Sequence, residues 1–154
     1  MQNQIKTQTR LAFIQFIFSS LFTNSSVEET TSDFENYFYK LSVSSIQQKK
    51  ETPINFNKNY FKKLTKNYDE FVKNNNIEAI INSIIKFERN YENWDHINKS
   101  IILSILSELE ITKKEKVKTL LNDYINISKM FVPKKDLSMI NAITDKYLSD
   151  RNIL

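Results

Sequence analysis

The chain contains no glycine, and its only prolines are Pro53 and Pro133. β-Hairpins and other tight turns rely on glycine, because it adopts positive φ without steric cost. A chain without it is therefore predicted to be all-α. Its 154 residues are typical of one domain, so we expect a compact single-domain helical bundle over residues 1–154. The missing glycine also excludes the Gly-rich loops that bind the phosphates of nucleotides and dinucleotides.

Apolar residues recur every three or four positions in seven stretches, which is the spacing of helices that bury one face. We expect six or seven α-helices and no sheet, at about residues 4–22, 26–41, 59–73, 77–91, 95–109, 112–131 and 136–147. The stretch 95–109 has the most continuous apolar core, which includes Leu106, and is predicted to be the central helix. The polar connection 42–58 is the best candidate for a mobile loop.

Three polar residues are predicted to cap helix N-termini. Ser26 with Glu29, and Thr112 with Glu115, have the spacing of a capping box, in which the hydroxyl accepts a hydrogen bond from a backbone N–H three residues later. Asp136 is the predicted N-cap of the last helix.

The residues that carry most enzyme and metal chemistry are scarce. The chain has no cysteine and one histidine, His96, whose neighbouring carboxylates Glu92 and Asp95 form a weak set of metal ligands. No serine lies between glycines, so no nucleophile and base can be paired from local pattern. We interpret His96 as a helix-start residue. The expectation is a binding protein with no catalytic residues, no metal and no cofactor.

Residues 11–23 are apolar and follow Lys6 and Arg10, as the core of a secretory signal would. Gln15 interrupts this core, however, and no small-residue cleavage site follows it. The segment is also shorter than the roughly 20 apolar residues of a membrane-spanning helix. We therefore expect a cytoplasmic protein with no membrane partner.

The formal net charge is +4 and the pI about 9.1, a mild excess that favours an anionic partner. No acidic residue precedes Glu28, so the first helix is predicted to present Lys6, Arg10 and the amino terminus to a polyanion unopposed. Further clusters lie at Lys58, Lys62, Lys63 and Lys66, at 113–118, and at Lys134 and Lys135. Each cluster also fits the simpler interpretation of a solvated helix face.

The last third of the chain contains three apolar segments with polar residues set into them, IILSILSELE, KVKTLLNDYINISKMF and MINAITDK. The polar residues are Glu108, Asn122, Asp123, Asn141 and Asp145. This arrangement resembles the C-terminal signature of the NusB family of transcription antitermination factors. The opening TRLAFIQFIFSSLF resembles the first helix of that family, and Trp94 with Ile97 and Ile101 fits its approach to the signature. The resemblance covers nearly the whole chain.

The resemblance implies an all-helical protein without a cofactor. Members of the family pair with the ribosomal protein NusE, and the heterodimer binds single-stranded boxA RNA. That complex helps RNA polymerase to read through terminators, notably in bacterial ribosomal RNA operons. Relatives include homodimers and monomers, so a homodimer is one of the expected states.

The resemblance also implies which residues meet each partner. The positions expected to contact RNA are Lys6, Arg10, Gln15, Phe18, Lys118, Lys134 and Lys135. Phe18 is expected to lie next to the cations of the first helix, and Lys134 and Lys135 to lie in the loop before the last helix. The positions expected to contact a NusE-like protein are Phe18, Glu92 and Asn98. Asn122 and Asn141 are expected to be buried amides that fix how helices meet, and Asp145 with Lys146 to form a surface pair.

Several positions depart from the family pattern. The first helix keeps only two cations, Phe18 replaces a tyrosine, and Leu103 replaces an arginine. Met139 stands where relatives place a phenylalanine beside the RNA, and Ala142 replaces a glycine. These departures leave two alternatives open. One is a helical protein-interaction module that has lost RNA binding. The other is the NusB-like domain found fused to ribosomal RNA cytosine methyltransferases, although no methyltransferase follows within this chain.

Overall fold

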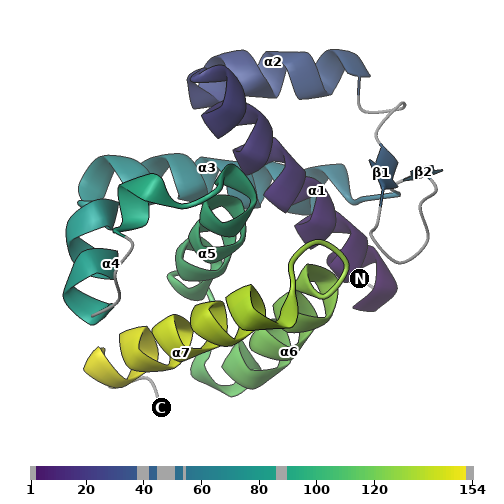
Figure 1. Ribbon diagram of the computed structural model, residues 1–154. Coiled ribbons are helices and arrows are strands. Elements are labelled where there is room, and N and C mark those ends of the chain that lie inside the picture. The colour runs from purple at the N-terminus through teal and green to yellow at the C-terminus, as the bar shows by residue number, and fades with distance from the viewer. Residues whose placement is uncertain (1–2, 38–41, 45–50, 54, 86–89, 152–154) are drawn as a thin grey trace.

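The computed structural model of the chain describes residues 3–37, 42–44, 51–53, 55–85 and 90–151 (Figure 1). Within them the predicted all-α class is confirmed. Seven α-helices are present: α1 (Asn3–Thr23), α2 (Val27–Tyr37), α3 (Lys58–Asn74), α4 (Ile77–Ile84), α5 (His96–Leu109), α6 (Val117–Ser128) and α7 (Lys134–Asp150). Two short 3₁₀ helices, η2 (Tyr91–Asn93) and η3 (Lys114–Lys116), precede α5 and α6.

The expected absence of any sheet is wrong in one detail. Two three-residue strands, β1 (Ser42–Ser44) and β2 (Glu51–Pro53), pair antiparallel with Val43 opposite Thr52. The strands themselves need no positive φ, and Pro53 stands at a strand end, where a missing N–H is tolerated. The hairpin lies at the edge of the molecule (Figure 1) and belongs to the predicted connection 42–58. Residues 45–50 and 54 of that connection lie outside the described residues.

Local capping explains several helix starts. The Ser26 hydroxyl accepts a hydrogen bond from the Glu29 amide (3.1 Å), as predicted. The side chains of Asn57 and Asn76 cap α3 and α4 in the same way, accepting from amides three residues later at 2.8 and 3.1 Å. Helix α4 ends at Ile84, earlier than the predicted residue 91, because Ile85 adopts an extended conformation.

Two predicted caps are wrong. The Thr112 hydroxyl donates back to the Glu108 carbonyl (2.5 Å), so it extends the end of α5 and leaves α6 without a side-chain cap. Asp136 lies in the first turn of α7, whose N-cap is Pro133. The Asp136 carboxylate instead accepts a hydrogen bond from the Asn98 side chain on α5 (3.2 Å). The Thr112 side chain thus closes the end of α5, and the Asp136 side chain joins α7 to α5.

Helix α5 is the centre of the bundle, as the sequence predicts. Ile101, Ile102 and Leu106 are fully buried, and α1, α3, α6 and α7 pack around them (Figure 1). Helix α3 lies on one side of α5 and the pair α6 and α7 on the other. The helices of the described residues include none that is both long and apolar enough to cross a bilayer.

Candidate functional site

A buried ionic cluster joins α1 to three other helices. Arg10 donates through Nε and Nη2 to the Glu108 carboxylate on α5, with Nη2 to Oε2 at 2.8 Å, and through Nη1 to Asp123 Oδ2 on α6 at 2.6 Å. The hydroxyls of Tyr60 on α3 and Tyr124 on α6 also donate to Glu108, at 2.5 and 2.6 Å. One carboxylate is therefore held by donors from three side chains, which is the condition for burying a charge at acceptable cost.

The cluster shifts the ionisation of its members. Burial alone would lower the pKa of Arg10, but the hydrogen bond and the negative charge of Glu108 raise it above its ordinary value. Burial and then the Glu108 carboxylate raise the pKa of Tyr60 and hold the pKa of Tyr124 well above the usual range. The arginine is therefore charged and both phenols are neutral at physiological pH.

The prediction that Arg10 faces a polyanion unopposed is wrong. Arg10 is 7% exposed, and its guanidinium is neutralised from within by Glu108 and Asp123. Thr7 donates a further hydrogen bond to Asp123 (2.7 Å). Arg10 therefore fixes α1 against α5 and α6, and it has no face left for an RNA phosphate.

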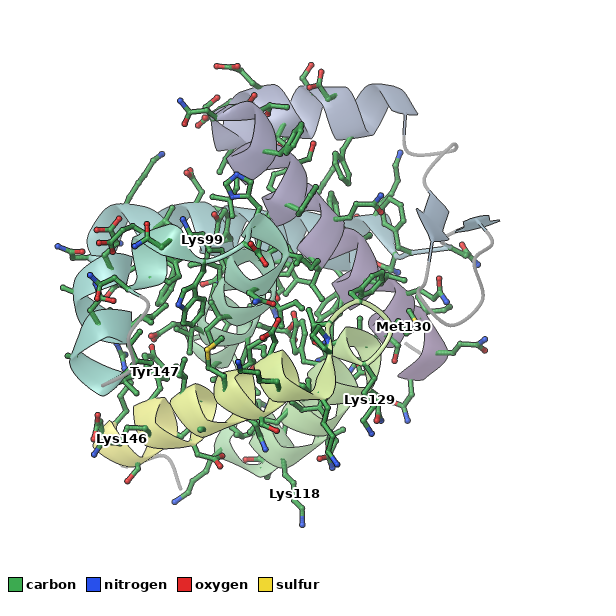
Figure 2. All side chains as sticks on the ribbon, viewed as in Figure 1. Lys99, Lys118, Lys129, Met130, Lys146 and Tyr147 are labelled. Carbon is green, nitrogen blue, oxygen red and sulfur yellow. The ribbon has the colours of Figure 1, made fainter. Side chains whose placement is uncertain are left out.

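A groove between α6 and α7 brings together part of the predicted RNA set. Its lining residues are Ile125, Lys129, Val132, Lys134, Leu137, Ser138 and Asn141. Lys118 and Asn122 lie on the same face of α6 as Lys129, at helical spacings of eleven and seven residues. The ammonium groups of Lys118, Lys129 and Lys134 are thus placed along one side of the molecule, with amides between them. Figure 2 shows Lys118 pointing away from the body of the protein into solvent.

The two signature amides are not buried, which corrects the expectation for both. Asn122 and Asn141 are exposed, and Asn141 lines the groove. Their side chains are accessible to a ligand and do not fix the meeting of helices. The expected pair of Asp145 with Lys146 is also wrong, because Lys146 bonds to Asp150 one turn later (3.0 Å).

The other predicted RNA positions are dispersed. Lys134 and Lys135 are exposed, but they form the first turn of α7 and do not lie in the loop before it. Lys6 is half-buried near the start of α1 and Gln15 is half-buried midway along it. Phe18 is twelve residues beyond Lys6, which is about 18 Å along a helix axis. The expectation that Phe18 adjoins the cations of the first helix is therefore wrong.

Phe18 instead belongs to an aromatic patch formed by Phe18, Phe22 and His96. The Phe18 and Phe22 rings stack with centroids 5.9 Å apart, and the His96 ring lies edge-on to both at 6.4 Å. Phe22 is 69% exposed and His96 is exposed, so the patch faces solvent where α1 ends and α5 begins. An exposed aromatic surface of this kind is typical of a protein interface.

The two remaining partner positions differ in accessibility. Glu92 is exposed on η2, and its carbonyl accepts a hydrogen bond from Lys99 Nζ (3.1 Å). Asn98 is 6% exposed and is turned inward toward Asp136. The Asn98 side chain is therefore buried and connects α5 to α7.

Sequence reasoning missed Phe22, His96 and Lys129. The i, i+4 spacing of Phe18 and Phe22 was the available signal for the aromatic patch. Nothing local links either residue to His96, which lies on another helix. Lys129 comes directly after α6 in the chain. It is part of a groove only because the start of α7 lies beside it. The described residues include no group of three or more His, Asp or Glu side chains placed to hold a metal ion.

The sequence profile of the NusB family matches residues 7–149, which is nearly the whole chain. This stretch contains the ionic cluster, the groove and the aromatic patch. No curated protein is similar enough to the chain to count as a match.

Proposed function

Because this chain belongs to the NusB family, we propose that it is an RNA-binding transcription antitermination factor. We propose further that it acts with a NusE-like ribosomal protein on boxA-type RNA, as part of an RNA polymerase complex that supports ribosomal RNA transcription. The match over residues 7–149 is the observation that carries this proposal. The protein is proposed to be a cytoplasmic binding protein and not an enzyme.

The groove between α6 and α7 is the proposed RNA site. Ammonium groups of Lys129 and Lys134 can neutralise phosphates, and the exposed amide of Asn141 offers both a donor and an acceptor to an unstacked base. Lys118 and Lys135 extend the charge along α6 and α7. Lys6 and Gln15 remain proposed contacts from α1, whereas Arg10 is assigned to the interior.

The aromatic patch of Phe18, Phe22 and His96 is the proposed contact for the NusE-like protein. Phe22 offers a large exposed ring, and aromatic residues that become buried at an interface supply much of its binding free energy. Glu92 stands four residues before His96 and can add a charged contact at the edge of the patch. Asn98 supports this region indirectly through Asp136.

RNA titration tests the proposal. A labelled boxA-like RNA and a scrambled RNA of equal length would be titrated with the chain, alone and with its NusE-like partner, by fluorescence anisotropy. The expected result is tighter binding of the boxA-like RNA. Lys129→Gln with Lys134→Gln should weaken it, while Lys146→Gln with Lys73→Gln, which removes two exposed lysines elsewhere, should not. Equal binding of both RNAs by the complex would contradict boxA recognition.

The burial of Arg10 favours one alternative function. With Arg10 neutralised, α1 offers RNA only Lys6 among its described cationic side chains, so a helical interaction module without RNA binding is the second candidate. That protein would bind the NusE-like partner through the aromatic patch and would show no salt-dependent binding to either RNA. The same titrations, with the partner interaction measured separately, distinguish the two.

A further inference from the structure

Four lysines form a row at the start of α3, at positions 58, 62, 63 and 66. No acidic residue lies between Lys58 and Tyr68. Lys62, Lys63 and Lys66 are exposed, and none of the three forms a salt bridge with another part of the chain that the structure describes. We call these four residues the α3 lysine row.

The helix geometry turns this row away from the core. Phe61, Leu64 and Tyr68 are buried against α1 and α5, so the opposite face of α3 is left to solvent. Lys62 and Lys66 are four residues apart and stand one above the other on that face. Side chains of equal charge at this spacing repel one another, and a bound polyanion would relieve the repulsion.

The row carries four of the chain's 22 Lys and Arg residues, against 18 Asp and Glu residues in all. No acidic residue stands within the row, so Lys62, Lys63 and Lys66 attract an anionic partner to this part of α3.

The row has defined ends. At the N-terminal end, the Asn57 amide donates to the Thr9 hydroxyl (3.0 Å), which ties the start of α3 to α1 within one helical turn of Lys6. At the C-terminal end, Asp69 and Glu70 follow Lys66 by three and four residues, and Asp69 is paired with Lys73 (2.9 Å), so the run of positive charge ends there. The row is on the opposite side of α5 from the groove of α6 and α7 (Figure 1). The start of α1, which carries Lys6, contacts the start of α3 through Thr9 and contacts α6 through Thr7.

We propose that the α3 lysine row is a second phosphate-binding surface, which holds RNA that extends beyond the segment in the groove of α6 and α7. This inference rests on the proposed RNA-binding function and adds to it a site for flanking nucleotides. Lysine ammonium groups on an exposed helix recognise the RNA backbone and not its bases, so this surface adds affinity without sequence preference.

The test uses the full chain and two RNAs that share one boxA-like core. The short RNA has about 12 nucleotides, within the range of site sizes of small single-strand-binding domains. The longer RNA adds unstructured flanks to the same core. Affinities are measured over a series of salt concentrations for wild type and for Lys62→Gln with Lys66→Gln. The matched control is Lys73→Gln with Lys146→Gln, which changes net charge equally outside the row. Circular dichroism confirms that each variant folds.

The row variant should bind the long RNA more weakly, and the slope of log K against log salt should become shallower by about 0.7 for each lost phosphate contact. Its binding to the short RNA, and both affinities of the control, should match wild type. If wild type binds both RNAs and the row variant has an unchanged slope on the long one, the second surface is wrong while the proposed function stands. If wild type binds neither RNA, the second surface and the proposed RNA-binding function are both contradicted.

Discussion

Arg10 and Glu108 are 98 positions apart in the chain and form a two-point salt bridge inside the bundle, with Nε and Nη2 of the arginine donating to the carboxylate. Asp123 binds the same guanidinium, and Tyr60 and Tyr124 bind the same carboxylate. Side chains of α1, α3, α5 and α6 therefore meet at one charge pair. The position of α1, which carries both Lys6 and the aromatic rings, depends on this pair.

Replacing Arg10 with alanine should lower the free energy of unfolding by about 3 to 5 kcal/mol, because the change leaves Glu108 buried without its countercharge. Lys6→Ala on the same helix is the control and should change stability much less, because Lys6 is only half-buried and forms no salt bridge among the described residues. Urea unfolding followed by circular dichroism measures both. Equal midpoints for the two variants would mean that Arg10 is not a buried partner.

Replacing Leu106 with alanine should cost about 2 to 5 kcal/mol of unfolding free energy, because it removes a fully buried side chain and leaves a cavity at the centre of α5. Ile111, which follows α5 and is 38% exposed, provides the matched control. Ile111→Ala should cost much less in the same urea experiment. Similar losses for both variants would show that α5 is not the centre of the core.

The helices could be predicted from the sequence because their apolar spacing is local information. The ends of α1 and α5 are predicted within one residue, and Leu106 is buried as expected. The caps at Thr112 and Asp136 could not be predicted in the same way. A hydroxyl or carboxylate near a helix end has several acceptors or donors within reach. Thr112 bonds to the Glu108 carbonyl one turn back, and Asp136 bonds to Asn98 on another helix.

The candidate site was harder to predict for a related reason. Arg10 has no acidic neighbour in sequence for 17 residues, so it resembled a free cation, and only folding brings Glu108 and Asp123 to it. Asn122 and Asn141 lie in apolar stretches, yet a one-residue step moves a side chain about 100° around a helix. Asn141 therefore faces outward although the preceding Ile140 is buried, and Asn122 faces outward although Tyr124, two residues later, is buried.

Stability should fall as pH rises above about 10. Burial and the Glu108 carboxylate raise the pKa of Tyr60 and Tyr124, and burial raises the pKa of Tyr68 to about 12. Above the ordinary pKa of about 10, the unfolded chain loses these protons while the folded chain keeps them. The unfolded state then binds fewer protons, so each such tyrosine reduces stability by up to about 1.4 kcal/mol per pH unit.

Urea unfolding at a series of pH values from about 8 to about 11 measures this slope. Tyr124→Phe should make the slope of unfolding free energy against pH shallower, because the variant lacks one phenol whose pKa is raised by folding. This result is expected whatever the variant's stability at neutral pH. A wild-type slope that does not steepen above pH 10 would contradict the burial of the phenols in this cluster.

Replacing Phe22 with alanine should weaken binding of the NusE-like protein by about tenfold or more, since an exposed ring that becomes buried at an interface can contribute over 1 kcal/mol. The stability of the Phe22→Ala variant should differ little from that of wild type, because the Phe22 ring is 69% exposed. Ile111→Ala tests whether any exposed apolar residue has the same effect. Isothermal titration calorimetry with the partner gives both affinities, and undiminished binding by Phe22→Ala would move the partner surface elsewhere.

RNA and the NusE-like protein should strengthen each other's binding. With Arg10 neutralised internally, the free chain offers a basic surface with no cation cluster on α1, and a basic partner lying beside it would lengthen that surface. Thermodynamic linkage then requires the partner to raise RNA affinity by the same factor by which RNA raises partner affinity.

Two pairs of titrations check this reciprocity. One pair adds RNA to the chain with and without partner, and the other adds partner to the chain with and without RNA. Factors of roughly 5 to 150 are typical of such coupling. Phe22→Ala is the informative variant, because it should abolish the gain in RNA affinity while leaving RNA binding by the free chain unchanged. An RNA affinity that is the same with and without the partner would remove the cooperative mechanism. The chain would then bind its two partners independently, RNA in the groove between α6 and α7 and the NusE-like protein on the aromatic patch where α1 ends.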